Sequence, residues 1–350
     1  MTQVPDALIS VVGPVEKRLQ EVLQEQTSRW VQIDAQLEEP LNILRSFVIG
    51  GGKRLRPAFC YWSFVGAGGN PDDIQIWNAG AAFELLHAFA LIHDDVMDGS
   101  DSRRNNETVH TYFTSQHAVQ NYKGESRRFG DGLAILIGDL AEVFADALMT
   151  ASNADAFQVW NELKIELNIG QFLDVMGAAT GNVDLEAARQ IVRYKSGKYT
   201  IERPLHLGAA IAGKAGTYEA TLSAYGAPLG DAFQLRDDIL GIFGEPERTG
   251  KPVGDDLREG KPTPLFAFAR QHANPAQQQK LQRIGETDIS AEEIFDLQTV
   301  FIETGAVAAT EKLIGELTAQ AIAAIDAIEY IPAAKNALRE LAIYVGERDL

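Results

Sequence analysis

The segment IWNAGAAFELLHAFALIHDDVMD, residues 76–98, decides the fold that this sequence predicts. It is rich in Ala and Leu and apolar almost all round, which is typical of a helix buried at the centre of a protein. Its last turn nevertheless carries Asp94, Asp95 and Asp98. Asp94 and Asp98 share one helix face, and Gly99 ends the helix, so like charges gather at the negative end of the helix dipole. The local cost is about 1–3 kcal/mol, so we expect a bound partner that offsets it.

Helical periodicity also dominates the rest of the chain. Three more long apolar helices are expected at 132–149, 156–179 and 220–243, and shorter amphipathic helices at 11–30, 36–48, 57–66, 184–196, 290–304, 306–328 and 332–346. Gly, Pro or charge marks the expected loops at 98–107, 121–131, 244–262 and 272–276. Alternating strand patterns and a domain boundary are missing. We therefore expect an all-α, single-domain bundle over residues 1–350, with its longest helices at the centre.

Composition and charge exclude several classes of protein. Hydrophobic residues make up 45% of the chain and charged residues 23%, which allows a sizeable core. The formal net charge of −18 argues against nucleic-acid binding and against a polybasic membrane anchor. The lone Cys60 fits a reducing compartment. No signal-peptide pattern opens the sequence and no apolar run reaches the length of a membrane span, so we expect a soluble, cytoplasmic protein.

A second acidic pair lies in FQLRDDILGIFG, residues 233–244. Asp237 and Asp238 again come late in an apolar helix, shortly before Gly241. Clustered carboxylates raise one another's pKa values, and a divalent cation removes that cost. Only oxygen ligands are offered, without a His–Cys cluster, which favours a hard ion such as Mg²⁺ that also binds water and phosphate oxygens. Two solvated helix ends are the alternative interpretation.

Basic residues are concentrated close to the first acidic cluster and in one glycine-rich run. GGKRLRP, residues 51–57, sets Lys53, Arg54 and Arg56 behind flexible backbone ahead of a helix start, which predicts an anion site. Two more arginines directly follow the first acidic cluster, and their planar guanidinium groups match phosphate oxygens. Either basic run alone would indicate a solvated surface. Together with the carboxylates they predict two anionic ligands, one bound through metal and one not.

These motifs resemble those of the trans-isoprenyl diphosphate synthases of the polyprenyl synthetase family, and most closely a bacterial geranylgeranyl diphosphate synthase. They appear in order as GGKRLRP (51–57), HAFALIHDDVMDGSDSRR (87–104), GQFLD (170–174), YKSGKY (194–199), FQLRDD (233–238) and GKPVGDDLREGK (250–261). The resemblance begins at about residue 40 and leaves 1–39 as a peripheral N-terminal helix. It implies the single-domain isoprenoid synthase fold, about a dozen helices around a deep central cavity, and a homodimer.

The resemblance implies a magnesium centre that joins the two aspartate motifs. Asp94 and Asp98, together with Asp237, would bind three Mg²⁺ ions that bridge the allylic diphosphate. Asp95 and Asp238 would support these sites.

The resemblance also implies two diphosphate sites. The diphosphate of isopentenyl diphosphate would be held by Lys53, Arg56, His87 and Arg104. The allylic diphosphate (dimethylallyl, geranyl or farnesyl) would be bound by Arg103, Lys195, Ser196 and Lys251 and its pocket lined by Gln171, Asp174 and Gln234. Lys261 would contact phosphate or close the loop over the site. Outside the motif context, His87 would be an ordinary core histidine and Gln171 an ordinary buried amide.

The implied activity is a magnesium-dependent, head-to-tail condensation that gives a trans product. Loss of diphosphate leaves an allylic cation, the double bond of isopentenyl diphosphate attacks it, and a proton then leaves to the departing diphosphate. Mg²⁺, Lys and Arg neutralise the charge of the leaving group, so no side-chain nucleophile is needed. The apolar helices would exclude water from the cation.

Product length is expected to depend on three residues before Asp94. Phe89 lies about 7–8 Å along the helix from Asp94; Ala90 is small and Leu86 lies deeper. In the family, an aromatic residue in the place of Phe89 with this short aspartate spacing usually accompanies a C20 product. We therefore expect geranylgeranyl diphosphate, with C15 or C25 as alternatives and a purely structural Phe89 as the other interpretation.

Two departures from the family pattern stand out. Gly241 occupies the fifth place of the second DDxxD motif, which predicts the loss of one water-mediated contact. RRNNETVH places Asn105 and Glu107 in a loop of altered sequence.

Three rival functions are compatible with parts of the sequence. A di-iron bundle would use the pairs Glu84–His87 and Glu107–His110, but the second pair lies in a polar, turn-like segment. A terpene cyclase would carry an Asn–Ser–Glu metal motif that is missing here. A non-catalytic partner subunit would have lost its aspartate motifs, whereas this chain keeps both.

Overall fold

The computed structural model describes residues 3–104, 106–180, 190–191, 193–244, 254–260, 263–286 and 288–347. The elements of the first half are α1 (Asp6–Val31), the 3₁₀ turn η1 (Ala35–Leu37), α2 (Glu38–Ile49), α3 (Leu55–Gly66), α4 (Ile74–Asp98), β1 (Ser102–Arg103), β2 (Asn106–Glu107), α5 (Val109–Val119), α6 (Ser126–Met149) and α7 (Ala154–Thr180). Those of the second half are the π-helix η2 (Arg193–Glu202), α9 (Arg203–Ile211), α10 (Ala215–Phe243), α12 (Asp255–Glu259), α13 (Pro264–His272), α14 (Pro275–Leu281), α15 (Ala291–Glu303), α16 (Ala306–Ala327) and α17 (Pro332–Glu347). The all-α prediction is confirmed.

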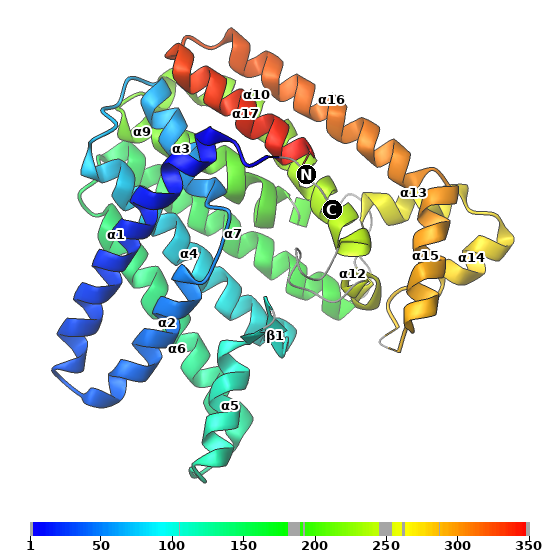
Figure 1. Cartoon of the computed structure of the whole chain (residues 1–350), viewed down its shortest axis with the longest axis horizontal. Coiled ribbons are helices and arrows are strands. Elements are labelled where there is room, and N and C mark those ends of the chain that lie inside the picture. Colours follow the sequence, from blue (N-terminus) through cyan, green and yellow to red (C-terminus); the bar gives the residue numbers. More distant parts are fainter. Residues whose placement is uncertain are drawn as a thin grey trace.

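The four long apolar helices of the sequence analysis are present as α4, α6, α7 and α10. Around them, Figure 1 shows α1 and α2 along one side and α16 spanning the opposite side towards α13, α14 and α15. The amphipathic helices predicted near both ends of the chain correspond to α1, α2, α3, α15, α16 and α17.

Several predicted loops contain regular structure. α6 begins at Ser126, inside the predicted loop 121–131. The sequence predicted a loop there because the first turn of the helix is polar and faces outward. β1 and β2 form an antiparallel pair inside the predicted loop 98–107, with Ser102 opposite Glu107. α12 lies within 244–262, and the predicted break at 272–276 is a short connection between α13 and α14.

The helix predicted over 184–196 differs most from expectation. Residues 190–191 are helical and 193–202 form a π-helix, while 181–189 and 192 lie outside the described residues. The sequence also did not predict α5, α9, α13 and α14, because all four are short. α5, α13 and α14 also bury few residues, whereas α9 is buried almost throughout.

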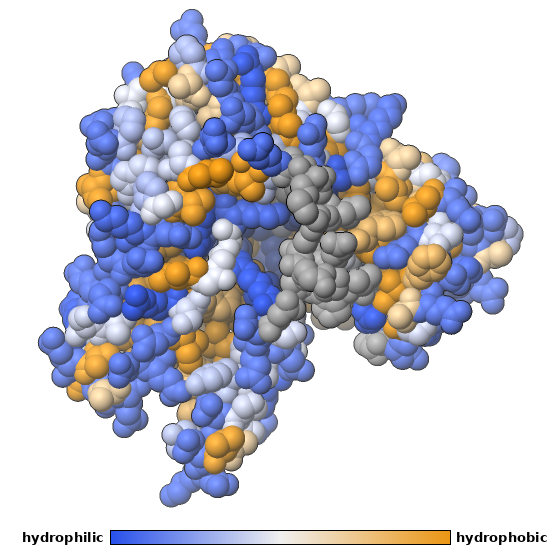
Figure 2. All heavy atoms as spheres, in the orientation of Figure 1, coloured by the Kyte–Doolittle hydropathy of each residue, from blue (hydrophilic) through white to orange (hydrophobic). Residues whose placement is uncertain are grey.

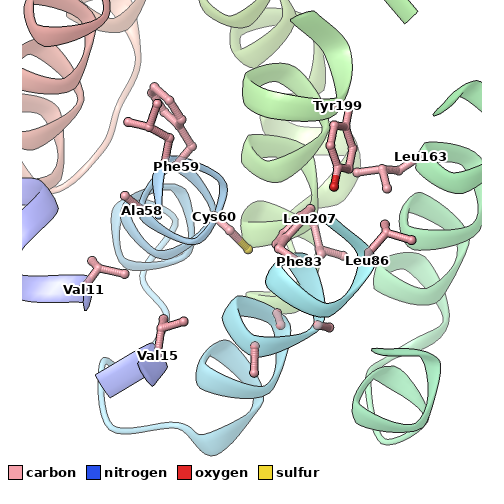
Figure 3. Close-up of a cluster of buried hydrophobic side chains, with 14 of the residues drawn as sticks. Val11, Val15, Ala58, Phe59, Cys60, Phe83, Leu86, Leu163, Tyr199 and Leu207 are labelled. Carbon is pink, nitrogen blue, oxygen red and sulfur yellow. The ribbon is translucent and has the colours of Figure 1, made fainter. Parts of the chain in front are cut away.

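The main hydrophobic core surrounds α4. In Figure 3, Phe83 and Leu86 of α4 lie against Leu163 of α7, Leu207 of α9 and Tyr199 of η2. Each fully buried large apolar side chain contributes about 1.5–3 kcal/mol of stabilisation. The burial of α4 on nearly every side, from Ile76 to Ile92, explains why its sequence is apolar all round.

A second hydrophobic cluster lies beyond the C-terminal half of α10. It is built by α10, α12, α13, α15 and α16, and its fully buried members include Leu265 and Phe301. α10 contributes Leu229 to the main core and Ile239 to this second cluster, so one continuous helix links the two. The aspartate pair near the end of α10 is thereby fixed to both parts of the structure.

Among the residues that the structure describes, no helix is both long enough and apolar enough to cross a membrane.

Candidate active site

The first acidic motif lies at the C-terminal end of α4, as the sequence predicts. Asp95 is buried, Asp94 is half-buried and Asp98 is exposed. Gly99 ends the helix in the left-handed conformation, with φ 66°, and its N–H donates to the carbonyl of Asp95. Its missing side chain makes this conformation inexpensive.

Lys195 of η2 offsets the charge of Asp94. Its Nζ donates to Asp94 Oδ1 at 2.9 Å and to Asp174 Oδ2 of α7 at 2.6 Å. Gln171 Nε2 of α7 also donates to Asp94 Oδ1 at 2.9 Å. Burial would raise the pKa of Asp94, but the charge and hydrogen bonds of Lys195 and Gln171 hold it below its usual value. Three elements thus meet at Asp94.

Arg103 is the partner of Asp95. Its Nε and its terminal nitrogen Nη2 each lie 2.8 Å from Asp95 Oδ1, and the same Nη2 lies 3.6 Å from Asp94 Oδ2. Burial raises the pKa of Asp95, and Arg103 offsets only part of that effect. Asp95 Oδ2 is buried and has no hydrogen-bond partner within the protein. The β1–β2 pair holds Arg103 over the end of α4.

The glycine-rich run before α3 places one of its three cations differently from the prediction. Arg54 has φ 54° and turns into the protein, where its guanidinium forms an ion pair with Glu84 of α4 and donates to the carbonyl of Val48 at 3.0 Å. Both side chains are almost fully buried. Arg54 therefore anchors the segment rather than lining an anion site, and Lys53 and Arg56 remain the candidates.

Arg56 lies in a cluster with His87 and Tyr199, called here the cationic cluster because Arg56 and the nearby Arg104 carry its charge. Its Nη2 donates to Thr200 Oγ1 at 3.2 Å, and its guanidinium carbon lies 4.3 Å from the centre of the Tyr199 ring. The His87 and Tyr199 ring centres are 6.1 Å apart. Arg56 Nε, His87 Nδ1 and the Tyr199 hydroxyl are buried without a hydrogen-bond partner within the protein. Tyr199 was not singled out from the sequence, although the motif YKSGKY contains it.

His87 is held in its neutral form. Burial lowers its pKa well below the usual value, and the positive charges of Arg56 and Arg104 lower it further. Arg104 itself has φ 52° and donates to the carbonyl of Gly51 at 3.1 Å, which ties the end of β1 to the glycine-rich run. Neutral imidazole beside several guanidinium groups is an environment that favours an anionic ligand.

The second acidic motif lies on α10. Gln234 Nε2 donates to Asp238 Oδ1 at 2.9 Å; Asp238 is buried and Asp237 half-buried. A side-chain carbon at Gly241 would lie 1.8 Å from Asp256 Oδ2 of α12. The carboxylate of Asp256 from α12 thus fills the space that a side chain at position 241 would occupy.

The structure does not assemble the predicted metal ligands into one cluster. Within the described residues, no group of three or more His, Cys, Asp and Glu side chains is arranged to hold a metal ion. The donor set nevertheless fits a hard divalent ion, because it consists of carboxylates, and Lys195 already brings a cation between Asp94 and Asp174. The ligand roles of Asp94, Asp98 and Asp237 stay predictions.

The remaining predicted residues lie partly within and partly outside the described part of the chain. Ser196 is half-buried on η2 beside Lys195, while Lys251, Lys261 and Asn105 lie outside the described residues. Leu86 and Phe89 are buried, and the Phe89 ring packs edge-on against His93 with their centres 4.6 Å apart. Ala90 is half-buried.

The pairing of Glu84 with Arg54 removes the main support for a di-iron site. Glu107, of the second proposed pair, is exposed on β2.

On the face shown in Figure 2, hydrophilic side chains border a hollow in the middle of the molecule.

Comparison with known proteins agrees with this geometry. The polyprenyl synthetase family model matches residues 37–299, so the chain belongs to the polyprenyl synthetase family. Its activity is that of a trans-prenyltransferase, and its fold is the all-α isoprenoid synthase fold.

Three similar proteins illustrate the relationship. A crystal structure of geranylgeranyl pyrophosphate synthase from Corynebacterium glutamicum, complexed with isoprenyl diphosphate and magnesium, has a TM-score of 0.88 and 38% identity, and covers 96% of this chain and 98% of that one. Geranylfarnesyl diphosphate synthase of Aeropyrum pernix is 36% identical over 63% of this chain and 66% of that protein. A short chain isoprenyl diphosphate synthase of Methanocaldococcus jannaschii is 31% identical over 80% of each chain. Other relatives are farnesyl and octaprenyl diphosphate synthases, so similarity leaves product length open.

The buried Arg54–Glu84 pair generates a stability prediction. Glu84→Gln should lower the free energy of unfolding by about 3 kcal/mol, because the buried guanidinium of Arg54 loses its only buried counter-charge and keeps the partly exposed Glu16 alone. Urea unfolding followed by circular dichroism measures this change. The control is Glu16→Gln, since Glu16 lies 3.6 Å from the same guanidinium but is 39% exposed; its effect should stay within about 0.5 kcal/mol. Equal losses in the two variants would contradict the structural role of the pair.

Proposed function

We propose that the protein condenses isopentenyl diphosphate with an allylic diphosphate, in a magnesium-dependent, head-to-tail reaction that gives a trans product. The observation that carries the proposal is the presence of two separate groups of cationic side chains beside one helix, one at Asp94 and one at His87. Asp94, with Lys195 and Arg103, lies at the end of α4, and His87 lies seven residues earlier, about 10 Å away at 1.5 Å per residue. The separation suits two diphosphates whose hydrocarbon parts meet between them.

The allylic diphosphate is assigned to the region around Asp94. We propose three Mg²⁺ ions held by Asp94, Asp98 and Asp237, with Asp95 and Asp238 in support. The unpartnered Oδ2 of Asp95 and the carboxylate of Asp256 beside Gly241 add oxygen donors of the type that Mg²⁺ prefers. Arg103, Lys195 and Lys251 would contact the diphosphate from the protein side.

The second diphosphate is assigned to the cluster around His87. Lys53, Arg56 and Arg104 would neutralise the diphosphate of isopentenyl diphosphate, and neutral His87 would donate one hydrogen bond to it. Arg56 Nε and His87 Nδ1, both buried without a partner, are the atoms best suited to this role. Gln171, Asp174, Ser196 and Gln234 would line the allylic pocket, and Lys261 would act at its loop.

The residues of this chain account for the remaining chemistry. Magnesium supplies charge neutralisation of the leaving diphosphate. Lys195 and Arg103 add fixed positive charge on the protein side, and the apolar faces of α4 and α7 keep water from the allylic cation. The departing diphosphate accepts the proton, so no side chain needs to act as a base.

We propose geranylgeranyl diphosphate as the main product, with Phe89 as the floor of the cavity and Leu86 and Ala90 beside it. The relatives support this range of sizes but include shorter and longer synthases, so C15 and C25 remain the alternatives. Phe89 is 8% exposed and sits one to two turns before Asp94, a position compatible with a cavity wall.

We also propose that the protein is a cytoplasmic, single-domain homodimer. One face of α6 packs against α4, while the opposite face exposes Leu136 at 58%, Leu140 at 37% and Val143 at 60%. These residues recur at helical spacing, and a contiguous apolar stripe of this kind marks an interaction surface. The buried, reduced Cys60 supports the cytoplasmic assignment.

Purified protein is incubated with labelled isopentenyl diphosphate, one allylic primer and Mg²⁺. After dephosphorylation the extracted prenols should be mainly C20. Asp94→Asn should lower kcat/KM by about 10²-fold or more, because one negative ligand of the metal centre is lost. Asp146→Asn is the control, since Asp146 lies near the C-terminal end of α6 and accepts a hydrogen bond from Lys164 of α7. No product with any primer would overturn the proposed function.

Phe89→Ala should shift the product towards longer prenols, because it removes the ring that closes the cavity. Chromatographic sizing of the extracted prenols measures the shift. Phe64→Ala removes another buried ring, from α3, away from the acidic motif, and should leave product length unchanged. Unaltered chain lengths in Phe89→Ala would show that Phe89 serves only the core.

Leu136→Glu should convert a dimer into a monomer, because it places a charge in the centre of the apolar stripe. Light scattering after size exclusion should give about twice 38.2 kDa for the wild type and about 38.2 kDa for the variant. Ile33→Glu, at an even more exposed apolar residue outside α6, should stay dimeric. A monomeric wild type would refute the dimer.

A further inference from the structure

The position of Lys195 depends on an unusual backbone conformation. Lys195 lies in η2, a ten-residue π-helix. π-helical segments are rare and usually limited to single turns. They are frequent at functional sites. A segment of this length therefore needs neighbours that hold it in place.

Glycines let η2 lie directly against two helices. A side-chain carbon at Gly170 of α7 would lie 2.7 Å from the backbone nitrogen of Lys195. On the other side, a side-chain carbon at Gly230 of α10 would lie 2.9 Å from Cα of Gly197. These contacts limit how far η2 can move sideways, and the buried side chains of Tyr199 and Ile201 anchor its second half in the core.

Glu166 adds an ion-pair contact between η2 and α7. It is buried on α7, one turn before Gly170. Its Oε1 accepts from Lys198 Nζ at 2.5 Å and from Arg203 Nη2 at 2.7 Å, and its Oε2 accepts from Arg203 Nε at 2.7 Å. The bidentate Arg203 contact is geometrically strict, because a planar guanidinium meets a planar carboxylate.

The two lysines of YKSGKY thus bind different carboxylates on α7. Lys195 reaches Asp174 and, across to α4, Asp94, whereas Lys198 reaches Glu166 two turns earlier on α7. A shift of η2 by one residue would exchange or break both contacts. Glu166 itself touches neither Asp94 nor the cationic cluster around His87.

We propose that Glu166 is a positioning residue. It binds Lys198 of η2 and Arg203, the first residue of α9 directly after η2, and so holds η2 with Lys195 pointing at the allylic diphosphate site. This inference rests on the proposed role of Lys195 in that site. It predicts that Glu166 affects binding of one substrate only, and only through Lys195.

Steady-state kinetics with Glu166→Gln test the inference. The KM for the allylic diphosphate should rise at least tenfold, while the KM for isopentenyl diphosphate should change less than twofold. Glu166→Asp, which keeps the charge, should recover part of the loss. Glu162→Gln is the matched control, since it removes the same charge one turn earlier on the exposed face of α7 and should leave both KM values unchanged.

A double variant separates positioning from general stability. In a Lys195→Ala background, Glu166→Gln should add less than a twofold change in allylic KM, because residues that act as a unit are not additive. Full additivity, or equal rises in both KM values, would overturn the inference. If Lys195→Ala alone leaves the allylic KM unchanged, the proposed role of Lys195 fails instead. Should Glu166→Gln not fold, Lys198→Gln breaks the same contact from η2 and must reproduce the tenfold rise.

Discussion

The structure depends on how it accommodates negative charge at the end of a buried helix. α4 is apolar on nearly every side, yet it ends in carboxylates at the negative end of its dipole. The protein itself supplies part of the compensation: Lys195 contacts Asp94, and Arg103 contacts Asp95. Lys195 comes from η2, 101 residues further along the chain than Asp94, whereas Arg103 lies only eight residues after Asp95. The acidic site is therefore complete only when η2 lies beside α4 and α7.

Buried ion pairs recur wherever a functional segment must be held still. Arg54 and Glu84 fix the glycine-rich run before α3, and Glu166 fixes η2. A buried charge without its partner is costly, so each pair strongly disfavours other arrangements of its segment. Close backbone contacts at glycines have the same effect, as between Gly230 and Gly197.

The sequence predicted those parts of the site that follow from local pattern. The apolar helices, the aspartate pairs and the residues of GQFLD and YKSGKY were identified from the sequence. In the structure Gln171 and Lys195 contact Asp94, and Asp174 contacts Lys195. The direction of the Arg54 side chain could not be predicted, because its partner Glu84 is thirty residues away. The motif is compatible with a buried arginine as well as with an exposed one. Glu166 had no sequence signal, since a single Glu on a long helix is ordinary.

The amino-acid sequence by itself determined the all-helical class, the central position of α4 and the identity of the acidic and basic motifs, because hydrophobic periodicity and local charge are encoded residue by residue. The tertiary structure decided which cation faces which carboxylate, the π-helical form of η2, and the placement of Asp256 beside Gly241. Those features depend on distances between helices, and such distances are set only when the side chains of the whole core pack together.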